Sequence, residues 1–211
     1  MTTPRRALIV IDVQNEYFDD DRPLAVAYPP RDESLKRVLA AMDAAQKAGV
    51  PVVTVAHVWP EDAPVFAEGS DGARLHPDVA ARSDAVAAHV EKQRSSVLTS
   101  KGLPEWLREN AIDTLTLVGY MTNNCVLASA AAAEPEGLAV EVLSDATGAI
   151  NLSNAAGSAS AQQVHETLMV LLHSNWAAVA DTDAWIEAVA EGLPLDKSDL
   201  GSSAVQGRAD H

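Results

Sequence analysis

Cysteine is nearly absent from this sequence of 211 residues, in which Cys125 is the single example. With one cysteine, no disulfide can form within the chain, and a cysteine-rich metal cluster is excluded. The lack of disulfides fits a reducing compartment. Two arginines precede the apolar residues 7–11 (ALIVI), but Asp12 ends this run short of the roughly seven apolar residues that a secretory signal needs. We therefore expect a cytoplasmic protein.

Positive charge is also scarce. Lys and Arg number 15 against 30 for Asp and Glu, which gives a net charge of −15. Such a surface repels phosphate backbones and anionic lipid headgroups, so we expect neither a nucleic acid nor a membrane as partner. No stretch approaches the roughly 20 consecutive apolar residues that span a bilayer. The remaining composition, 47% hydrophobic and 21% charged, is that of an ordinary globular protein.

Short apolar runs alternate along the chain with longer stretches of helical periodicity. The short runs are rich in Val, Ile, Leu and Thr and predict buried strands at residues 7–11, 50–56, 114–118 and 138–143. Apolar residues three or four positions apart predict helices at residues 33–47, 103–110, 125–134 and 161–173. This alternation predicts an α/β fold, a three-layer α/β/α sandwich around a mainly parallel sheet.

The length suits a single domain, and the chain contains no internal repeat. We assign residues 1–192 to this domain, with residues 28–31 and 59–77 as long loops because they are rich in proline, glycine and charge. Residues 193–211 are polar and small and have no periodicity. They predict a disordered C-terminal tail.

Three residues of complementary chemistry follow predicted strands or the long loop. Asp12 comes directly after residues 7–11, Lys92 lies where the chain returns from the long loop, and Cys125 opens the predicted helix 125–134. The positive end of a helix dipole favours a thiolate, and free N–H groups there can bind an oxyanion. If the three converge, the thiolate attacks, the carboxylate accepts the thiol proton and the lysine stabilises the charged pair. Each also has a structural alternative: a buried apolar Cys125, an Asp12 bonded to backbone amides, and a solvated Lys92.

Three segments resemble the signature segments of the isochorismatase-like cysteine hydrolase superfamily: IDVQNEYF at 11–18, EKQRSSV at 91–97 and GYMTNNCV at 119–126. This superfamily includes isochorismatases, nicotinamidases, N-carbamoylsarcosine amidases and ureidoacrylate amidohydrolases. The resemblance extends over residues 6–189. Carried over by position, it implies that Asp12, Lys92 and Cys125 form a catalytic triad on the family's α/β fold.

The resemblance also implies the surroundings of the nucleophile. It implies a cis peptide bond between Tyr120 and Met121, and an oxyanion hole formed by the N–H groups of Met121 and Cys125. Gly119 would relieve crowding at this turn, and Thr122 would brace it. Gln14 and Asn15 follow Asp12 closely, and we expect their amides to orient its carboxylate, with ordinary loop capping as the alternative. The candidates for substrate contacts or for support of the triad are Gln14, Phe18, His57, Trp59, Tyr120 and Asn124.

Two positions differ from the nicotinamidase branch in a way that bears on metal binding. That branch carries an Asp-x-His motif after its second strand, and Ala56 and Val58 occupy these positions here. His57 alone cannot replace two absent ligands, so we expect no metal and no organic cofactor. Leu98 and Lys101 replace an aromatic residue and a threonine of the family pattern, which changes one wall of the pocket and leaves the triad intact.

The resemblance implies a hydrolase that cleaves a C–N bond of a small molecule through a covalent thioester. The bond would belong to a carboxamide, a carbamoyl group or a lactam. Vinyl-ether cleavage of isochorismate is an alternative within the family, although that reaction needs no thiol nucleophile. A non-catalytic binding or assembly module on the same fold is an alternative of another class. The resemblance further implies a homodimer or a larger homo-oligomer.

Overall fold

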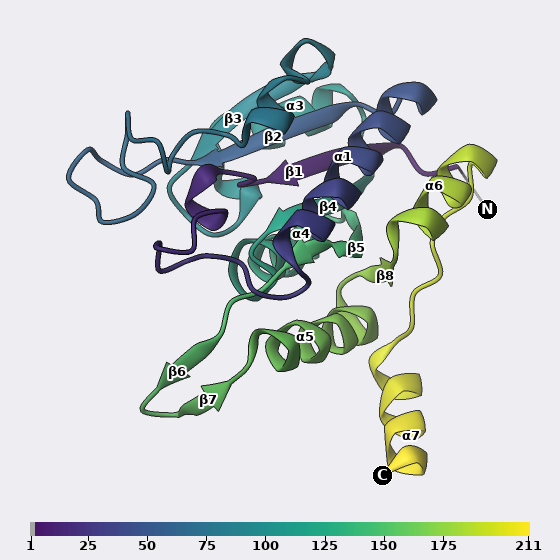
Figure 1. Ribbon diagram of the computed structural model, residues 1–211. Coiled ribbons are helices and arrows are strands. Elements are labelled where there is room, and N and C mark those ends of the chain that lie inside the picture. The colour runs from purple at the N-terminus through teal and green to yellow at the C-terminus, as the bar shows by residue number, and fades with distance from the viewer. Residues whose placement is uncertain (1–2) are drawn as a thin grey trace.

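One six-stranded sheet organises residues 3–211, the part of the chain that the computed structural model describes (Figure 1). The strand order is β3-β2-β1-β4-β5-β8, and every neighbouring pair is parallel. The strands are β1 (Arg6–Ile11), β2 (Val52–His57), β3 (Ala88–Lys92), β4 (Thr114–Tyr120), β5 (Ala139–Gly148) and β8 (Ala178–Ala180).

Helices cover both faces of the sheet and bury a separate apolar core on each (Figure 1). On one face lie α1 (Arg31–Ala48) and α6 (Thr182–Glu191). On the other face lie α3 (Leu103–Glu109), α4 (Leu127–Ala133) and α5 (Ala161–Asn175). This arrangement confirms the predicted three-layer α/β/α sandwich. The short helices are η1 (Asn15–Tyr17), α2 (Pro77–Ala80), η2 (Ser83–Ala85), η3 (Val97–Thr99) and the π-helical turn η4 (Thr122–Val126).

The central strand β1 shows why its sequence is apolar throughout. Successive side chains of a strand point to opposite faces, so Leu8 and Val10 enter one core, whereas Ile9 and Ile11 enter the other. All six residues of β1 are buried. A strand covered on both faces has no position for a solvated side chain, which explains the uninterrupted run ALIVI.

The order of the strands reverses between β1 and β4. The chain moves from β1 outward to β2 and β3, and then returns to the other side of β1 as β4. In open α/β sheets, ligands bind in the crevice outside the carboxyl ends of the strands at such a reversal. Asp12 follows β1 and Cys125 lies shortly after β4, so this crevice lies between the two predicted catalytic residues.

Several elements lie outside the predicted pattern. Strand β3 alternates between half-buried and exposed residues before it ends at the buried Lys92, as suits an edge strand, and it therefore lacks an apolar run. Strands β6 (Leu152–Asn154) and β7 (Gly157–Ala159) form a hairpin of mostly exposed residues that projects from the body (Figure 1). The strand β8 has only three residues, too few for an apolar run to stand out, and helix α6 was not among the predicted helices although Trp185 on it is buried.

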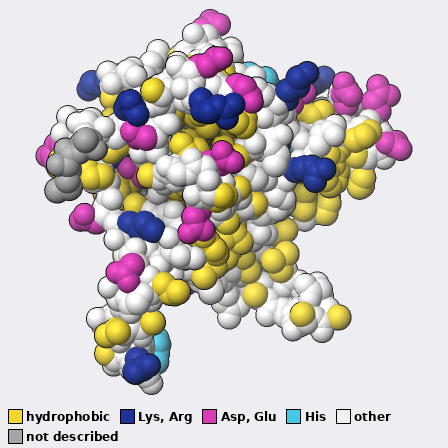
Figure 2. Space-filling model, turned by 180° about the vertical axis from the view of Figure 1, so that it is seen from behind, with side chains coloured by type: hydrophobic (Ala, Val, Ile, Leu, Met, Phe, Trp, Pro, Cys, Tyr) yellow, Lys and Arg dark blue, Asp and Glu magenta, His cyan; other side chains and the backbone are white. Residues whose placement is uncertain are grey.

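A helix replaces most of the expected disordered tail. Residues Leu200–Asp210 form α7, which projects from the body beside α5 (Figures 1 and 2). Asp199 caps this helix, because its carboxylate accepts the Ser202 N–H at 2.8 Å and the Ser202 hydroxyl at 2.7 Å. An aspartate at this position is a local sequence signal for the start of a helix, but the polar composition of the segment favoured the prediction of disorder. None of the residues of α7 is buried.

Candidate active site

Asp12 lies at the end of β1 with an unusual backbone conformation. Its φ of 49° is left-handed, a region that costs a non-glycine residue about 1 kcal/mol or more. The Asp12 N–H donates to Val55 O at 2.9 Å, which holds the residue against β2. This turn leaves the carboxylate fully buried at the carboxyl end of the sheet.

Lys92 is the last residue of β3, and its buried ammonium group joins the cluster. The Nζ atom lies 2.6 Å from Asp12 Oδ2, 3.0 Å from His57 Nδ1 and 3.2 Å from Cys125 Sγ. The structure therefore brings together the three residues predicted to form the triad, and it places the candidate His57 in contact with Lys92. Neither carboxylate oxygen of Asp12 accepts a hydrogen bond of good geometry in residues 3–211, so the attraction to Lys92 is mainly that of an ion pair.

Cys125 lies in the π-helical turn η4, between β4 and α4, and is almost completely buried. Ser129 connects this turn to the segment after Lys92. Its hydroxyl donates to Cys125 O at 2.6 Å and accepts the Val97 N–H at 3.0 Å. This pair of hydrogen bonds fixes the backbone around the cysteine relative to the strand that supplies the lysine.

The electrostatics of the thiol differ from the sequence expectation. The helix terminus was expected to favour a thiolate, but burial raises the pKa of Cys125 to about 12, with the Asp12 charge adding to the rise and Lys92 opposing it. Burial also raises the pKa of Asp12, against the influence of Lys92. Desolvation therefore outweighs the ammonium and the short helical turn, and the raised pKa favours the thiol form of Cys125. The resting cysteine is a thiol beside a carboxylate of increased basicity.

His57 lies inside the cluster, at the end of β2. Its ring stacks on Phe66, with centroids 5.3 Å apart, and meets the edge of Trp59 at 5.1 Å. Burial and the charge of Lys92 lower the pKa of His57 to about 4, so the ring is neutral at pH 7. Trp59 is half-buried and donates through Nε1 to Gln93 O at 3.3 Å.

Gln14 has a different role from the one expected. Its backbone N–H donates to Asp12 O at 2.8 Å, but in the described part of the chain its side-chain amide makes no hydrogen bond to the Asp12 carboxylate. Its amide nitrogen donates to His57 O at 2.9 Å and to Ala73 O at 2.7 Å, and its oxygen accepts the His57 N–H at 2.8 Å. Gln14 thus fixes the His57 backbone and holds the loop 58–76 against the end of β1. It positions the histidine rather than the carboxylate.

Two candidates, Tyr120 and Phe18, pack beside the cluster. Tyr120 is fully buried, and its hydroxyl forms a 2.8 Å hydrogen bond with Ser34 of α1. Burial raises the pKa of Tyr120. The half-buried Phe18 meets the Tyr120 ring edge-on, with centroids 5.6 Å apart. Tyr120 therefore uses its polar atom for core packing, whereas Phe18 retains a partly open ring.

The two asparagines before the nucleophile differ in exposure. Asn124, the sequence candidate, is exposed. Its neighbour Asn123 has a buried side-chain oxygen without a hydrogen-bond partner in residues 3–211. Local pattern cannot distinguish two adjacent asparagines, because which side chain is buried depends on the π-helical path of η4.

The turn between β4 and η4 has the backbone that the resemblance implied. The bond between Tyr120 and Met121 is cis, and Gly119 has a φ of 99°. A Cβ on Gly119 would run into the Ile11 carbonyl oxygen, so only glycine fits here. The Thr122 hydroxyl forms a 2.9 Å hydrogen bond with Nδ1 of the buried His165, which anchors the turn.

The donor atoms of Asp12, His57 and Cys125 lie within 4.8 Å of one another, a spacing that suits a metal ion. The Lys92 ammonium, however, lies within 3.2 Å of an atom of each of these residues. The cation shared by these donors is therefore the lysine. A divalent ion would fit this donor set only with the Lys92 side chain displaced.

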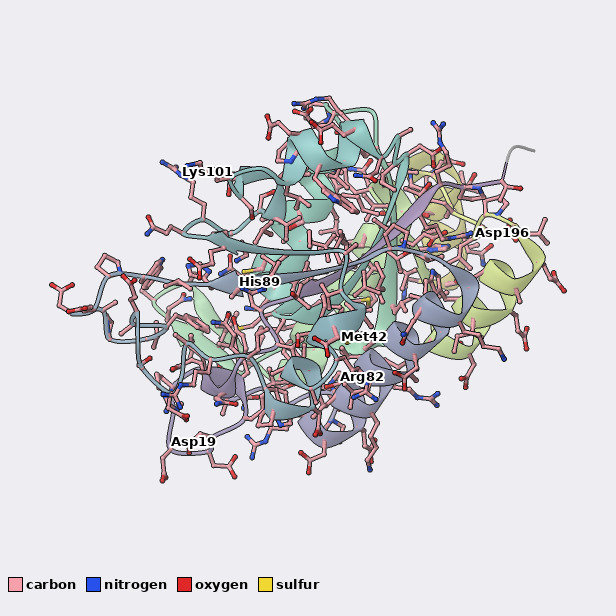
Figure 3. All side chains as sticks on the ribbon, turned by 90° about the horizontal axis from the view of Figure 1, so that it is seen from above. Asp19, Met42, Arg82, His89, Lys101 and Asp196 are labelled. Atoms are coloured by element: carbon pink, nitrogen blue, oxygen red, sulfur yellow. The ribbon has the colours of Figure 1, made fainter. Side chains whose placement is uncertain are left out.

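A groove of about 790 Å³ runs along the sheet edge next to the cluster. It is lined by Trp59 and Lys92 together with His89 and Lys101, both labelled in Figure 3. Lys101, one of the departures from the family pattern, therefore lies on the wall of this groove.

Comparison with known proteins agrees with this geometry. The isochorismatase domain model matches residues 6–184. The crystal structure of a candidate isochorismatase from Burkholderia xenovorans LB400 is 50% identical, with a TM-score of 0.94 over 99% of both chains. A secreted isochorismatase effector of Verticillium dahliae is 26% identical over 147 residues, which are 70% of this chain and 74% of that protein. Nicotinamidase 3 of Arabidopsis thaliana is 25% identical over 188 residues, 84% of this chain and 85% of that protein.

The matched region includes Asp12, Lys92 and Cys125 together with every strand of the main sheet. Among residues 3–211, none of the helices combines the length and the apolar character needed to cross a bilayer. The fold, the buried cluster and the extent of the match lead to one assignment. The chain belongs to the isochorismatase family of hydrolases.

Proposed function

We propose that this protein is a cysteine hydrolase that cleaves a C–N bond of a small carboxamide, carbamoyl compound or lactam. The observation that carries the proposal is the position of the buried Lys92 Nζ, 2.6 Å from Asp12 Oδ2 and 3.2 Å from Cys125 Sγ. An acid, a base and a nucleophile in contact at the crevice of an α/β sheet are what acyl transfer requires.

The raised pKa values of Cys125 and Asp12 define the first step. A thiol with a pKa of about 12 does not ionise in advance, so its proton passes to Asp12 as sulfur attacks the carbonyl carbon. Burial makes this carboxylate more basic than usual. The Lys92 side chain, in contact with both groups, stabilises the negative charge that moves from the carboxylate to the sulfur and the substrate oxygen.

The rest of the cycle returns each group to its starting state. Asp12 gives its proton to the leaving nitrogen, the C–N bond breaks, and an acyl thioester remains on Cys125. Water then adds to the thioester as Asp12 accepts its proton, and the C–S bond breaks as Asp12 returns that proton to sulfur, which releases a carboxylic or carbamic acid and regenerates the thiol and the carboxylate. The net reaction is amide plus water to acid plus amine or ammonia.

Backbone groups after β4 are suited to hold the oxyanion. The Met121 N–H donates to no backbone or side-chain acceptor within residues 3–211. It lies in the turn that leads to Cys125, so it remains available to an incoming oxygen. We assign the oxyanion hole to this group and the Cys125 N–H.

Amide cleavage accounts for the cluster better than the alternatives do. Hydrolysis of a vinyl ether needs no thiol, whereas this fold holds a thiol in contact with a lysine. One relative is named a nicotinamidase, which supports amide chemistry. A non-catalytic module has no need for a thiol buried beside an ion pair whose carboxylate lacks hydrogen bonds within residues 3–211.

The test is ammonia release and acyl-enzyme trapping on a panel of primary carboxamides, N-carbamoyl amino acids and lactams. We expect turnover of at least one class and, after acid quenching, an acyl adduct on Cys125 in the intact mass. Cys125→Ala is the matched control. Turnover that survives in this variant, or cleavage of a vinyl ether alone, would overturn the proposal.

A second copy of the chain is the partner that we propose for the surface around α5 and α7. Val170 of α5 and Val205 of α7 are 70% and 73% exposed, and Leu200 is also exposed. Figure 2 shows hydrophobic side chains on this side of the molecule. An isolated helix of 11 residues is marginal in water, so α7 gains from further packing. Light scattering should show a dimer or larger oligomer that Val205→Asp weakens.

The cytoplasmic location remains our prediction from the single cysteine and the short apolar run before Asp12. The relative named a secreted effector makes this worth measuring. Cell fractionation that finds the protein outside the cell would contradict the prediction.

A further inference from the structure

The ring of His57 has one nitrogen inside the cluster and one outside it. Its Nδ1 atom lies 3.0 Å from the Lys92 ammonium. An ammonium group carries only donors, so in this hydrogen bond Nδ1 is the acceptor. A neutral imidazole has its single proton on the other nitrogen. His57 is therefore the Nε2–H tautomer, fixed by Lys92.

The Nε2–H group is buried, and no acceptor in residues 3–211 receives its proton. A buried donor without an acceptor is rare in folded proteins and costs free energy, so its presence needs an explanation. The surroundings offer none, because the aromatic rings of Phe66 and Trp59 pack against the imidazole. Gln14 fixes the backbone of His57 on both sides, which holds the ring in this place.

We infer that His57 is a specificity-determining residue whose Nε2–H donates to an uncharged acceptor of the substrate, such as a second carbonyl oxygen next to the scissile one. The inference rests on the proposed function. It goes beyond the triad because it specifies a second polar group that the substrate must carry. The distance between the two groups is short, since one imidazole ring and the Lys92 ammonium separate Nε2 from Cys125 Sγ.

Charge favours an uncharged acceptor over a carboxylate. The nearby cation, Lys92, is already paired with Asp12, and His57 is neutral at pH 7. A substrate carboxylate buried here would lack a positive partner and would pay a desolvation penalty. An uncharged carbonyl oxygen has a smaller desolvation penalty and can accept the hydrogen bond that the His57 Nε2–H group offers.

The first measurement tests the donor itself and needs no turnover. Nitrogen-15 NMR of histidine rings in the full-length protein distinguishes the two tautomers, with His57→Gln identifying the resonance. We expect the Nε2–H form at pH 7. A proton on Nδ1, or a charged ring at pH 7, would overturn the inference even if the triad hydrolyses amides.

The second measurement tests the acceptor with small aldehydes, which add reversibly to a thiol and thus mimic the scissile carbonyl. Methyl glyoxylate has an uncharged ester carbonyl beside the aldehyde, glyoxylate has a carboxylate there, and butanal has no acceptor. Protection of Cys125 against iodoacetamide, followed by intact mass, gives the apparent Kd of each. The readout is specific because the chain has one cysteine.

Two variants separate the two ring nitrogens. His57→Asn keeps an acceptor for Lys92 near the Nδ1 position and removes the distal donor, whereas His57→Gln keeps a donor near the Nε2 position. We expect His57→Asn to weaken methyl glyoxylate binding about fivefold to tenfold, as for the loss of one hydrogen bond, and to change butanal binding less than about twofold. His57→Gln should retain most of the affinity. Relative to their adducts with free cysteine, methyl glyoxylate should bind the wild type more tightly than glyoxylate.

The outcomes separate this inference from the proposed function. Equal effects of His57→Asn on methyl glyoxylate and butanal, or tighter binding of glyoxylate, would overturn the role of His57 and leave the nucleophile intact. Failure of all three aldehydes to protect Cys125 would contradict the nucleophile, and the inference would fall with it.

Discussion

Two buried ion pairs lie at opposite ends of the same sheet, and they differ in how completely their polar atoms are satisfied. At the amino ends of the strands, the Glu141 carboxylate accepts hydrogen bonds from Arg6, Thr116 and Trp185, at 2.7 to 3.1 Å. At the carboxyl ends, Lys92 contacts Asp12 at 2.6 Å, but neither Asp12 oxygen accepts a well-formed hydrogen bond in the described chain.

The difference separates a structural pair from a reactive one. A fully bonded carboxylate stabilises the fold and has no capacity left for another ligand. A buried carboxylate whose oxygens lack hydrogen bonds lowers the stability of the folded protein. That stability is regained only when a ligand or a proton binds to the carboxylate. The Asp12 carboxylate, with its raised pKa, is of this incompletely bonded kind. The buried Nε2 of His57, which has no hydrogen-bond partner in residues 3–211, is a second unsatisfied group at the same end of the sheet. Burial alone would not have distinguished the two pairs, because all four charged residues are buried.

The largest effect that the comparison predicts is the loss of turnover in Cys125→Ala. We expect the rate of amide cleavage to fall about 10⁴-fold or more, because the thioester can no longer form. Urea unfolding should change little, since the substitution removes one sulfur atom from the core. A residual rate within tenfold of the wild type would contradict the nucleophilic role.

Arg6→Met should show the opposite pattern. It leaves Glu141 buried without its cation, and breaking a buried pair in this way costs about 3–5 kcal/mol of unfolding free energy. The rate of iodoacetamide labelling of Cys125 in the folded protein should stay unchanged, because the pair lies at the far end of the sheet. Urea unfolding and intact mass provide the two measurements. A changed labelling rate of Cys125 in fully folded Arg6→Met would mean that the two ends of the sheet are coupled.

The reactive end should also make the protein sensitive to acid. The pKa of His57 is lowered from 6.5 to about 4, so between these pH values the unfolded chain binds more protons than the folded one. Stability therefore falls as the pH falls through this window, by about 3 kcal/mol from His57 alone. Urea unfolding at pH 7 and pH 4.5 should show a smaller loss for His57→Asn.

Two groups provide controls on this pH dependence. His165 also has a lowered pKa through burial, so part of the acid sensitivity should persist in His57→Asn. Asp12 acts in the opposite direction, because its raised pKa lets the folded state take up a proton first. Asp12→Asn should therefore steepen the loss of stability in acid. If neither variant changes how steeply the unfolding free energy falls with pH, the acid sensitivity comes from other groups.

The sequence predicted the reactive end better than the structural end. Asp12 directly follows an apolar run, and Cys125 opens the predicted helix after the next buried strand, so their place near strand ends could be predicted from local pattern. The Arg6–Glu141 pair could not be predicted in this way, because 135 residues separate its members. Taken alone, each is only a single charged residue beside or within an apolar run. Long-range pairing depends on strand order, which one sequence does not reveal.

The surroundings of the triad were also beyond local pattern. The contact of Gln14 with His57 and Ala73 depends on the path of the loop 58–76, and the choice between Asn123 and Asn124 depends on a π-helical turn. The helix α7 was missed because its signal is a cap at Asp199 rather than a hydrophobic stripe. Local sequence pattern was enough to predict the triad residues, whereas the residues that contact and support them depend on the three-dimensional fold.

Replacing both members of each pair gives the smallest effect and the sharpest contrast. In Asp12→Asn/Lys92→Met the buried charges vanish, and asparagine tolerates the left-handed φ of 49°. We expect this variant to be about 2 kcal/mol more stable than the wild type, because an incompletely bonded pair costs more to desolvate than it returns. In Arg6→Met/Glu141→Met, Trp185 and Thr116 lose a shared acceptor, so stability should fall by a similar amount. Opposite signs in urea unfolding at pH 7 would show that the fold gives up stability at its carboxyl end to keep a reactive pair there. Equal signs would mean that hydrogen-bond satisfaction does not distinguish the two ends.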